Sequence, residues 1–436
     1  MNKKLKLLLY SLSFFIVICF SSLDFIKKGN YKNEEYYKQT IEQIKKVHFN
    51  NQLQEEFSVG WSKVNITPSK SMRLAGYGWI RDEFTKVRDS IFVRSILISQ
   101  KEKNYVIISY DLMLASKKLE EELESRKKEL GVDGIYISAT HTHNSFGGWD
   151  NSLFGSISVG WFDQEIVYKL VEKTVECIKK SKKKLSLGKI NYKEIETENL
   201  VMNKFSSNAH TDRKIRCIEF KTANKTAILC SFSAHANITP YTSFELSNDY
   251  PGFLIQHLEE SPKYDFALFC AGAVGLHKGD FSLIKKTYEG VKQYGIELAK
   301  KILNDNSANW EDSVIINYYQ HPVLLPRPTF KLSNCIRLRP YFFEKLSNKK
   351  NICEITQLNL NKVRLIGTPS DFSGELYKTI NHQNNTLITS FNGDYIGYII
   401  PDNYYNRTTY EARELNWYGS NTGSYFVEMI NEIIVK

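Results

Sequence analysis

The stretch GIYISATHTHNSFGG, residues 134–148, decides the fold and points to the site. It opens with an apolar run that is typical of a buried β-strand. Two histidines, His141 and His143, follow at the end of that run. Along extended backbone, residues i and i+2 point to the same face, so both imidazoles could face one cavity. The stretch therefore predicts a buried strand that brings two imidazoles to one site.

Other short apolar runs alternate with polar helical stretches from Val59 onward. Strands are predicted over 105–112, 134–140, 214–221, 226–234, 264–272, 362–370 and 386–392, and helices over 117–130, 251–260 and 290–303. The alternation predicts an α/β (α+β) fold with a mixed β-sheet core, packed helices and an active site at the strand ends. No Pro-, Gly- or Ser-rich linker interrupts residues 56–436, so we expect one domain there.

The composition is that of an ordinary globular protein. Of 436 residues, 42% are hydrophobic and 24% are charged, and the net charge is +10. The lysines are dispersed, and the densest run, 179–189, follows a helical pattern and is interpreted as a solvated helix end. No nucleic-acid motif accompanies it, so we expect no nucleic-acid partner. The seven cysteines are widely spaced and predict no disulfide framework.

The N-terminus has the pattern of a membrane-targeting segment. The basic MNKKLK precedes LLLYSLSFFIVICFSSL, which carries no charge before Asp24. Residues 1–24 are predicted as a signal anchor, with a cleaved signal peptide as the alternative. Residues 25–55 are charged and are interpreted as a spacer helix or linker. We therefore expect a domain tethered to a membrane through the apolar segment and lying outside the cytoplasm, in the periplasm or the extracellular space.

Four metal-capable side chains follow four of the predicted strands. They are His141 after 134–140, His235 after 226–234, Asp371 after 362–370 and Tyr398 after 386–392. Two histidines and a carboxylate, with one position left for water, are typical of catalytic zinc. Singly, each has a structural interpretation: a hydrogen-bonded histidine, a helix N-cap for Asp371, or packing for Tyr398. The joint pattern favours a metal site, in which His143 could move protons or bind substrate.

Five segments carry a resemblance to a known family. They are VGWSKVNITPSKSMRLAGYG (59–78), THTHNSFGGW (140–149), SFSAHANITP (231–240), GTPSDFSG (367–374) and YIGYIIPDNYYNRTTYE (395–411). In this order they resemble the zinc-dependent N-terminal catalytic domain of the neutral/alkaline non-lysosomal ceramidases. Their collinearity is more specific than any one motif, and it implies the fold and the metal of that family.

The resemblance also implies roles for seven residues. The implied Zn²⁺ ligands are His141, His235, Asp371 and Tyr398. The residues implied at the reacting carbonyl are His143 and Tyr410, together with Lys204, which stands in VMNKF where the family has an arginine.

This sequence departs from the family pattern in several places. Asp371 stands where the family has a glutamate, which is one methylene longer. Lys204 keeps the positive charge of the family's arginine but loses its planar fork. Asn144, Ser145 and Phe146 replace a Ser-Gly-Pro, and we expect this loop to border the substrate entrance. The chain ends 26 residues after Tyr410, so we expect no immunoglobulin-like C-terminal domain.

We therefore expect a membrane-tethered, zinc-dependent hydrolase acting on linear amides. It would cleave the amide bond of a lipid-like N-acyl (ceramide-like) substrate by metal-activated water. Two alternatives stay open: a hydrolase of a different amide or ester, and a non-catalytic lipid- or glycan-binding domain that retains the fold. The altered loop, Asp371 and Lys204 are the features that would favour the non-catalytic alternative.

Overall fold

The computed structural model describes Lys6, Tyr10 and residues 21–26, 29–49, 54–281, 287–381 and 384–436. The predicted signal anchor, residues 1–24, therefore lies almost wholly outside the described residues. None of the helices formed by the described residues combines the length and apolar content that a membrane crossing needs.

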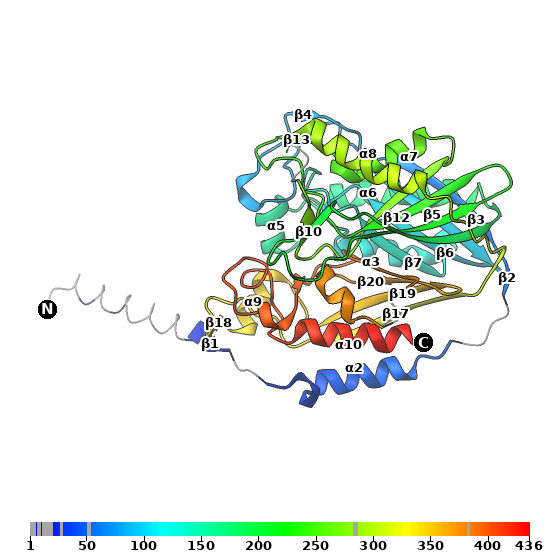
Figure 1. Cartoon of the computed structure of the whole chain (residues 1–436). Helices are drawn as coiled ribbons and strands as arrows, with labels where there is room; N and C mark the ends of the chain where they lie inside the picture. The colour runs from blue at the N-terminus through cyan, green and yellow to red at the C-terminus, as the bar shows by residue number, and fades with distance from the viewer. Residues whose placement is uncertain are drawn as a thin grey trace.

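Three mixed β-sheets form the centre of the molecule (Figure 1). The first has the order β7-β6-β5-β3-β8: β3 (Ser58–Asn65), β5 (Phe92–Gln100), β6 (Lys103–Tyr110), β7 (Gly134–Ala139) and β8 (Ser186–Leu187). The second has the order β14-β12-β11-β9: β9 (Lys189–Glu196), β11 (Lys214–Lys221), β12 (Thr226–Phe232) and β14 (Phe266–Ala271). The third has the order β17-β19-β20-β22: β17 (Ile316–Leu324), β19 (Ile352–Leu360), β20 (Val363–Gly367) and β22 (Thr386–Thr389).

Each sheet is built in the same way, with antiparallel neighbours and one parallel pair at an edge. The parallel pairs are β6/β7, β12/β14 and β20/β22. The strands predicted from the apolar runs are all present, and the expected mixed α/β fold is confirmed. Since parallel strands carry their carboxyl ends to the same edge, each pair delivers two loops to one place.

Five short strand pairs complete the β-structure. They are β1 (Leu23–Phe25) with β18 (Ile336–Leu338), β2 (Glu55–Glu56) with β16 (Ser313–Val314), β4 (Lys86–Val87) with β13 (Glu245–Leu246), β10 (Val201–Asn203) with β15 (His277–Gly279), and β21 (Asp371–Phe372) with β23 (Tyr398–Ile399). Two of them, β10/β15 and β21/β23, position side chains of the candidate site.

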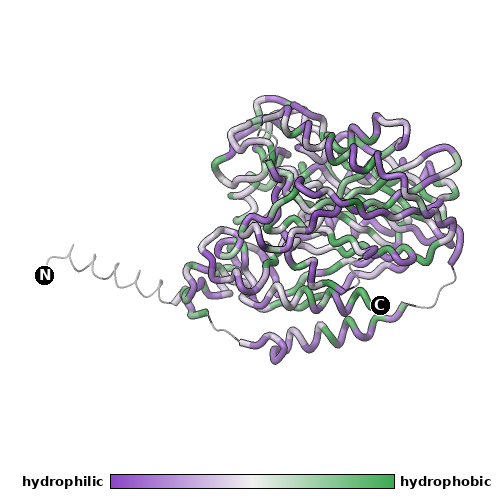
Figure 2. The backbone as a smooth tube through the Cα atoms, in the orientation of Figure 1, coloured by the Kyte–Doolittle hydropathy of each residue, from purple (hydrophilic) through white to green (hydrophobic). Residues whose placement is uncertain are grey.

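The helices lie on the outer faces of the sheets. They are α2 (Glu35–Lys46), α3 (Lys117–Ser125), α4 (Lys127–Leu130), α5 (Leu153–Val159), α6 (Gln164–Lys182), α7 (Asp249–Glu260), α8 (Tyr288–Asn304), α9 (Pro340–Ser347) and α10 (Thr422–Ile434). Short 3₁₀ turns are η1 (Tyr31–Asn33), η2 (Gly78–Ile80), η3 (Gly374–Thr379) and η4 (Asp402–Tyr404). Helix α6 packs on the first sheet, α7 on the second and α2 on the third. Figure 2 shows hydrophobic stretches along the inner strands and hydrophilic ones around the outside.

Helix α6 illustrates how the sequence encodes these elements. Its buried residues, among them Val167, Leu170 and Val171, recur at helical spacing and face the sheet. The Asp163 side chain caps the first turn by accepting from the Glu165 amide. Three lysines occupy the last turn, so the lysine-rich run does begin at a helix end, where cations suit the dipole.

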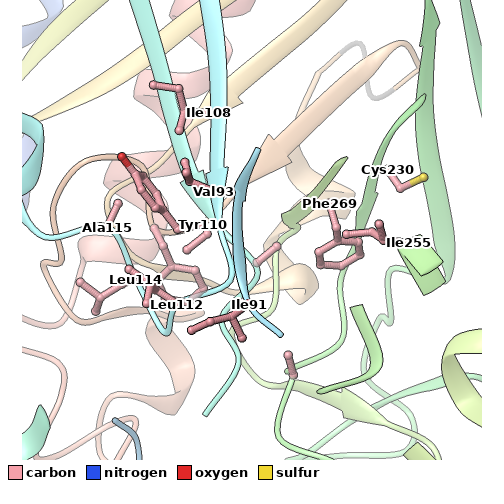
Figure 3. Packing of buried hydrophobic residues seen from close by; sticks show 14 of the residues in the cluster. Ile91, Val93, Ile108, Tyr110, Leu112, Leu114, Ala115, Cys230, Ile255 and Phe269 are labelled. Carbon is pink, nitrogen blue, oxygen red and sulfur yellow. The ribbon is translucent and has the colours of Figure 1, made fainter. Parts of the chain in front are cut away.

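One hydrophobic core contains side chains from all three sheets, including Ile107, Leu229 and Leu365. A second lies between the first two sheets and their helices, where Val93 and Ile108 pack on one side and Cys230 and Phe269 on the other (Figure 3). Leu112, Leu114 and Ala115 extend this packing beyond β6 into the loop that borders the candidate site.

The segment expected to be a spacer is packed against the body of the protein. In α2, Thr40 and Ile44 are buried beside the third sheet. The Tyr37 hydroxyl donates to Glu428 of α10 at 2.5 Å, and the Leu324 amide of β17 donates to the Thr40 hydroxyl at 3.0 Å. Residues 35–46 therefore form a structural layer. The sequence signal for this layer was an apolar residue, Ile44, within a mostly charged helix.

Candidate metal centre

The loop after β7 carries the two histidines of the first motif. The His141 amide donates to the Leu112 carbonyl at 3.0 Å, and the His143 amide donates to the Ala236 carbonyl at 3.1 Å. His141 has a φ of 62°, in the left-handed region that residues with a side chain rarely adopt. The two rings meet edge to face, with centroids 4.7 Å apart. The left-handed turn at His141 brings the two rings together. The sequence predicted their proximity from the alternation of side chains along an extended strand.

Backbone carbonyls fix two of the imidazoles in the same tautomer. His141 Nδ1 donates to the Met113 carbonyl at 2.6 Å. His235 Nδ1 donates to the carbonyls of Val274 and His277 at 2.9 and 3.1 Å. Each Nε2 is therefore left with a lone pair. This arrangement is usual for histidines that bind a metal, because the second hydrogen bond orients the ring.

The short pair β21/β23 places Asp371 directly beside Tyr398 in register. Asp371 Oδ1 lies 3.3 Å from His235 Nε2 and 3.8 Å from His141 Nε2. The Tyr398 hydroxyl lies 3.2 Å from His235 Nε2. The structure thus brings together the four residues predicted as ligands, and the aspartate reaches the group despite its shorter side chain.

The spacing of these atoms fits a tetrahedral metal site. A tetrahedron with zinc–ligand bonds of about 2.0–2.2 Å has edges of about 3.3–3.6 Å, close to the measured separations. Asp371 Oδ1 is buried and has no hydrogen-bond partner among the described residues, which is costly unless a cation sits beside it. Imidazole nitrogens with carboxylate and phenol oxygens form a donor set that suits zinc.

His143 lies beside this group and could also reach it. Its Nε2 is 3.2 Å from His141 Nε2, and the ligand atoms of His141, His143 and His235 all lie within 4.8 Å of one another. The sequence assigns His143 to proton transfer rather than to the metal. That assignment stays a prediction.

Burial keeps His141 and His143 uncharged. It lowers the pKa of His141 to about 3 against the opposing influence of Asp371. Burial and the neighbouring imidazoles hold the pKa of His143 well below its usual range. Burial alone would raise the pKa of the Asp371 carboxyl, but the nearby imidazoles of His235 and His141 and the hydrogen bond from Tyr395 lower it. At neutral pH His141 and His143 are therefore neutral, and Asp371 is a carboxylate.

Lys204 and Tyr410 meet at the exposed side of the site. Lys204 Nζ donates to the Tyr410 hydroxyl at 2.8 Å and to Glu411 Oε1 at 2.9 Å. Tyr410 is exposed, and its ring lies edge-on to Tyr398 with centroids 5.9 Å apart. Burial would lower the pKa of Lys204, but Tyr410 and Glu411 raise it, so the amine stays charged.

Four supporting side chains were not predicted. The Tyr395 hydroxyl donates to Asp371 Oδ2 at 2.7 Å, and Phe391 stacks on His141 with centroids 3.8 Å apart. Tyr77 packs against His143 at 5.1 Å, and Glu411 holds Lys204. Tyr77, Tyr395 and Glu411 lie inside the segments that carried the family resemblance, but their residue types alone give no signal of a role.

A buried arginine also lies near the site. The Arg81 guanidinium is 5.3 Å from the Tyr77 ring, and its Nη2 donates to the Ser243 carbonyl at 2.8 Å. Its Nε and Nη1 are buried without a hydrogen-bond partner among the described residues.

The expectation for the loop of Asn144, Ser145 and Phe146 was wrong. All three residues are buried, and Asn144 Nδ2 donates to the Glu245 carbonyl at 2.9 Å. The loop supports the candidate site from within and does not line its entrance. The exposed aromatic beside Tyr77 is instead Tyr241, with ring centroids 6.1 Å apart.

Comparisons with known proteins bear on the family and on the fold. Residues 57–260 match the family described as neutral/alkaline non-lysosomal ceramidase, N-terminal, which confirms the resemblance that the motifs carried. The matched range contains His141, His143, Lys204 and His235 and ends before Asp371. No curated protein matches the chain.

Two solved structures share the fold. The neutral ceramidase from Pseudomonas aeruginosa has a TM-score of 0.73 at 16% identity, over 87% of this chain and 75% of that chain. A ceramidase complexed with C2 has a TM-score of 0.74 at 15% identity, with the same shares of both chains covered.

Proposed function

Residues 57–260 belong to the neutral/alkaline non-lysosomal ceramidase N-terminal family, and from this premise we propose that the protein is a zinc-dependent hydrolase of an N-acyl, ceramide-like amide. One observation carries the proposal. His141, His235, Asp371 and Tyr398 converge at tetrahedral spacing, with His143 directly beside them.

The metal would be held by the four converging side chains. When bound there, Zn²⁺ supplies a Lewis acid that polarises a carbonyl and lowers the pKa of a water to about 7. The two backbone-anchored imidazoles set its position. Tyr395 holds the second oxygen of Asp371, so the carboxylate presents Oδ1 to the centre.

His143 is placed to move the proton. Its ring is neutral, so it can take a proton from the attacking water and return it to the leaving amine. Tyr77 packs against one side of the ring and Gly76 approaches it closely, so the ring is held in place. A base held in this way contributes about 10²–10⁴-fold to the rate.

Tyr410 and Lys204 would act on the carbonyl oxygen. The Tyr410 hydroxyl can donate to the oxygen as negative charge develops there, and the Lys204 ammonium stabilises that charge from 2.8 Å behind the phenol. Glu411 fixes the lysine side chain, which replaces part of the rigidity that an arginine fork would provide.

The same contacts favour catalysis over a purely binding role. The non-catalytic alternative drew on Asp371, Lys204 and the altered loop. Asp371 reaches the imidazoles, Lys204 contacts Tyr410, and the loop is buried. A lipid-like substrate, a tether through residues 1–24 and a location outside the cytoplasm are parts of the proposal that rest on the family and on the N-terminal sequence.

Metal content and hydrolysis, measured together, test the proposal. We expect the purified chain to contain zinc and to release fatty acid from a fluorescent N-acyl sphingosine in a chelator-sensitive way. His141→Ala should lose the metal, whereas His143→Ala should keep it and lose about 10²–10⁴-fold in turnover. His257→Ala, on α7 outside the site, is the matched control and should change neither.

Two outcomes would contradict it. Full zinc stoichiometry in His141→Ala would show that the ligand assignment is wrong. Loss of zinc in His143→Ala would make His143 a ligand and remove the proposed base. Turnover of esters or other amides, without turnover of the sphingosine substrate, would change the proposed substrate class. The metal assignment would stay unchanged.

A further inference from the structure

An exposed apolar face lies where β1 pairs with β18 and α9 begins (Figure 1). Its side chains are Phe25, Leu332, Tyr341, Phe342 and Leu346, which are 71%, 48%, 59%, 36% and 39% exposed. We call this set the α9 face. It is contiguous because Phe25 pairs with Ile336, the Leu332 amide donates to the Ile336 carbonyl, and α9 follows β18 directly. A soluble surface rarely carries such a concentration of large apolar groups unless something binds there.

The segment that forms most of this face is strongly basic. Residues 326–350 contain a single acid, Glu344, and seven basic residues: Arg327, Lys331, Arg337, Arg339, Lys345, Lys349 and Lys350. Glu344 pairs with Arg327 at 2.7 Å, and Arg337 pairs with Asp24 at 3.0 Å. Lys331 is buried, and Lys349 pairs with Asp394 at 3.6 Å. The exposed Arg339, Lys345 and Lys350 leave an excess of positive charge around exposed aromatic and aliphatic groups. This combination fits anionic lipid headgroups over an acyl boundary.

The N-terminal sequence leads to the same face. The apolar run of residues 7–23 ends in β1, which begins at Leu23 and pairs with β18. Attachment of residues 7–23 to a bilayer would therefore hold the α9 face close to the same bilayer. From the exposed apolar groups, the charge and this connection, we propose that the α9 face docks on an anionic lipid bilayer.

Packing continues from the α9 face to the margin of the candidate site. Phe154 of α5 meets Phe343 of α9 with ring centroids 5.4 Å apart, and α5 also packs against η2. Tyr77, the residue before η2, contacts His143. Leu153 and Ile157 of α5 and Ile80 of η2 are exposed along this path. Docking would thus bring the site to the surface from which a lipid substrate leaves, a consequence that rests on the proposed function.

Hydrogen exchange on the full chain tests the docking. The chain would be incorporated into nanodiscs of phosphatidylcholine alone, or of phosphatidylcholine with phosphatidylglycerol. We expect peptides covering residues 330–347 to exchange several-fold more slowly in the anionic discs than in the neutral ones, and less so in high salt. Peptides from α6 should exchange equally in both. The tether is present in both discs, so the difference reports the α9 face.

Matched variants test whether the exposed apolar side chains of the α9 face cause the slower exchange. Tyr341→Ser combined with Leu346→Ser should abolish the slowing, while Tyr168→Ser combined with Leu187→Ser, also at exposed positions, should preserve it. Equal exchange in the two discs, or failure of the chain to associate with anionic discs, would overturn the proposal. Hydrogen exchange that slows without lipid, and slows further as protein concentration rises, would also overturn the proposal. A second copy of the chain would then cover the face. No step requires turnover, so failed hydrolysis and failed docking remain distinguishable.

Discussion

His141 holds a left-handed backbone conformation, and the geometry of the candidate centre depends on it. With φ at 62° its ring stacks on Phe391 and its Nδ1 reaches the Met113 carbonyl. Such a conformation costs about 1–3 kcal/mol and persists only where the surroundings enforce it. The His-Thr-His spacing predicted that two imidazoles share a site. It did not predict the turn, because φ at His141 depends on contacts with the Leu112 carbonyl and the Phe391 ring, which are distant in sequence.

Gly76 controls the position of His143. A Cβ at this glycine would lie 2.9 Å from both Cβ and Nδ1 of His143, and φ at Gly76 is 86°. We expect Gly76→Ala to displace the ring and reduce turnover about 100-fold while zinc stays bound, since a displacement of about 1 Å can cost that much. The measurement is turnover together with metal content. Gly78→Ala, with φ of 65° and nothing within 4 Å of the new Cβ, is the control for backbone strain. An equal loss in both variants would contradict this prediction.

Tyr395 orients the carboxylate ligand. Removing its hydroxyl in Tyr395→Phe leaves Asp371 Oδ2 without its donor at 2.7 Å. We expect zinc affinity to fall about 10–100-fold, as is usual when a group that supports a metal ligand is lost. Competition with a chelator measures it. Tyr418→Phe, which removes a hydroxyl donating to the Lys350 carbonyl, should leave the affinity unchanged.

At the scale of elements, the sequence predicted the strands better than their partners. Alternation and apolar runs located β6, β7, β11, β12, β14, β20 and β22, and the β11/β12 hairpin, because these signals are local. The pairing of Asp371 with Tyr398 in β21/β23 joins segments whose sequences carry no complementary pattern. Their positions after two predicted strands, together with the family resemblance, predicted those two residues in one site, but neither predicted that they pair.

The residue that follows β6 makes a further prediction possible. Asp111 is buried and accepts from the Phe92 amide at 2.9 Å, and burial raises its pKa to about 6 against the influence of Arg94. The folded state therefore binds this proton more tightly than the unfolded state. The stability that the protonated carboxyl provides is complete below about pH 4 and is lost as pH rises through about 6.

Asp111→Asn should remove this dependence. We expect the free energy of unfolding of the variant, relative to the wild type, to rise by about 2–3 kcal/mol between pH 4 and pH 7, from a shift of about 2 units. Denaturant titrations at the two pH values measure it. A constant difference between variant and wild type would show that Asp111 does not titrate in this window.

At the scale of the molecule, residues outside the matched range complete the fold. The third sheet is covered by α2, from near the start of the chain, and α2 also contacts α10. This layer was missed because α2 is mostly charged and buries only Thr40 and Ile44. The fold class followed from composition and pattern, but the position of an amphipathic helix depends on which surface the rest of the fold leaves uncovered.

Ile44→Ala should reveal how far α2 contributes to stability. Ile44 is fully buried in the core that includes Phe343 and Tyr425. We expect a loss of about 2–5 kcal/mol in the free energy of unfolding, as for other large-to-small changes in a core. Denaturant-induced unfolding measures it, with the exposed Gln43→Ala in the same helix as control. A change below about 0.5 kcal/mol would mean that α2 is held only at the surface.

The three parallel strand pairs have a consequence for biosynthesis. The candidate ligands follow one pair from each sheet, and His141 precedes Tyr398 by more than half of the chain. A ribosome must therefore complete the third sheet before all four ligands exist together. Nascent and truncated polypeptides that stop before Tyr398 would carry the imidazoles without the full donor set, so the candidate centre would mature only after synthesis has passed Tyr398.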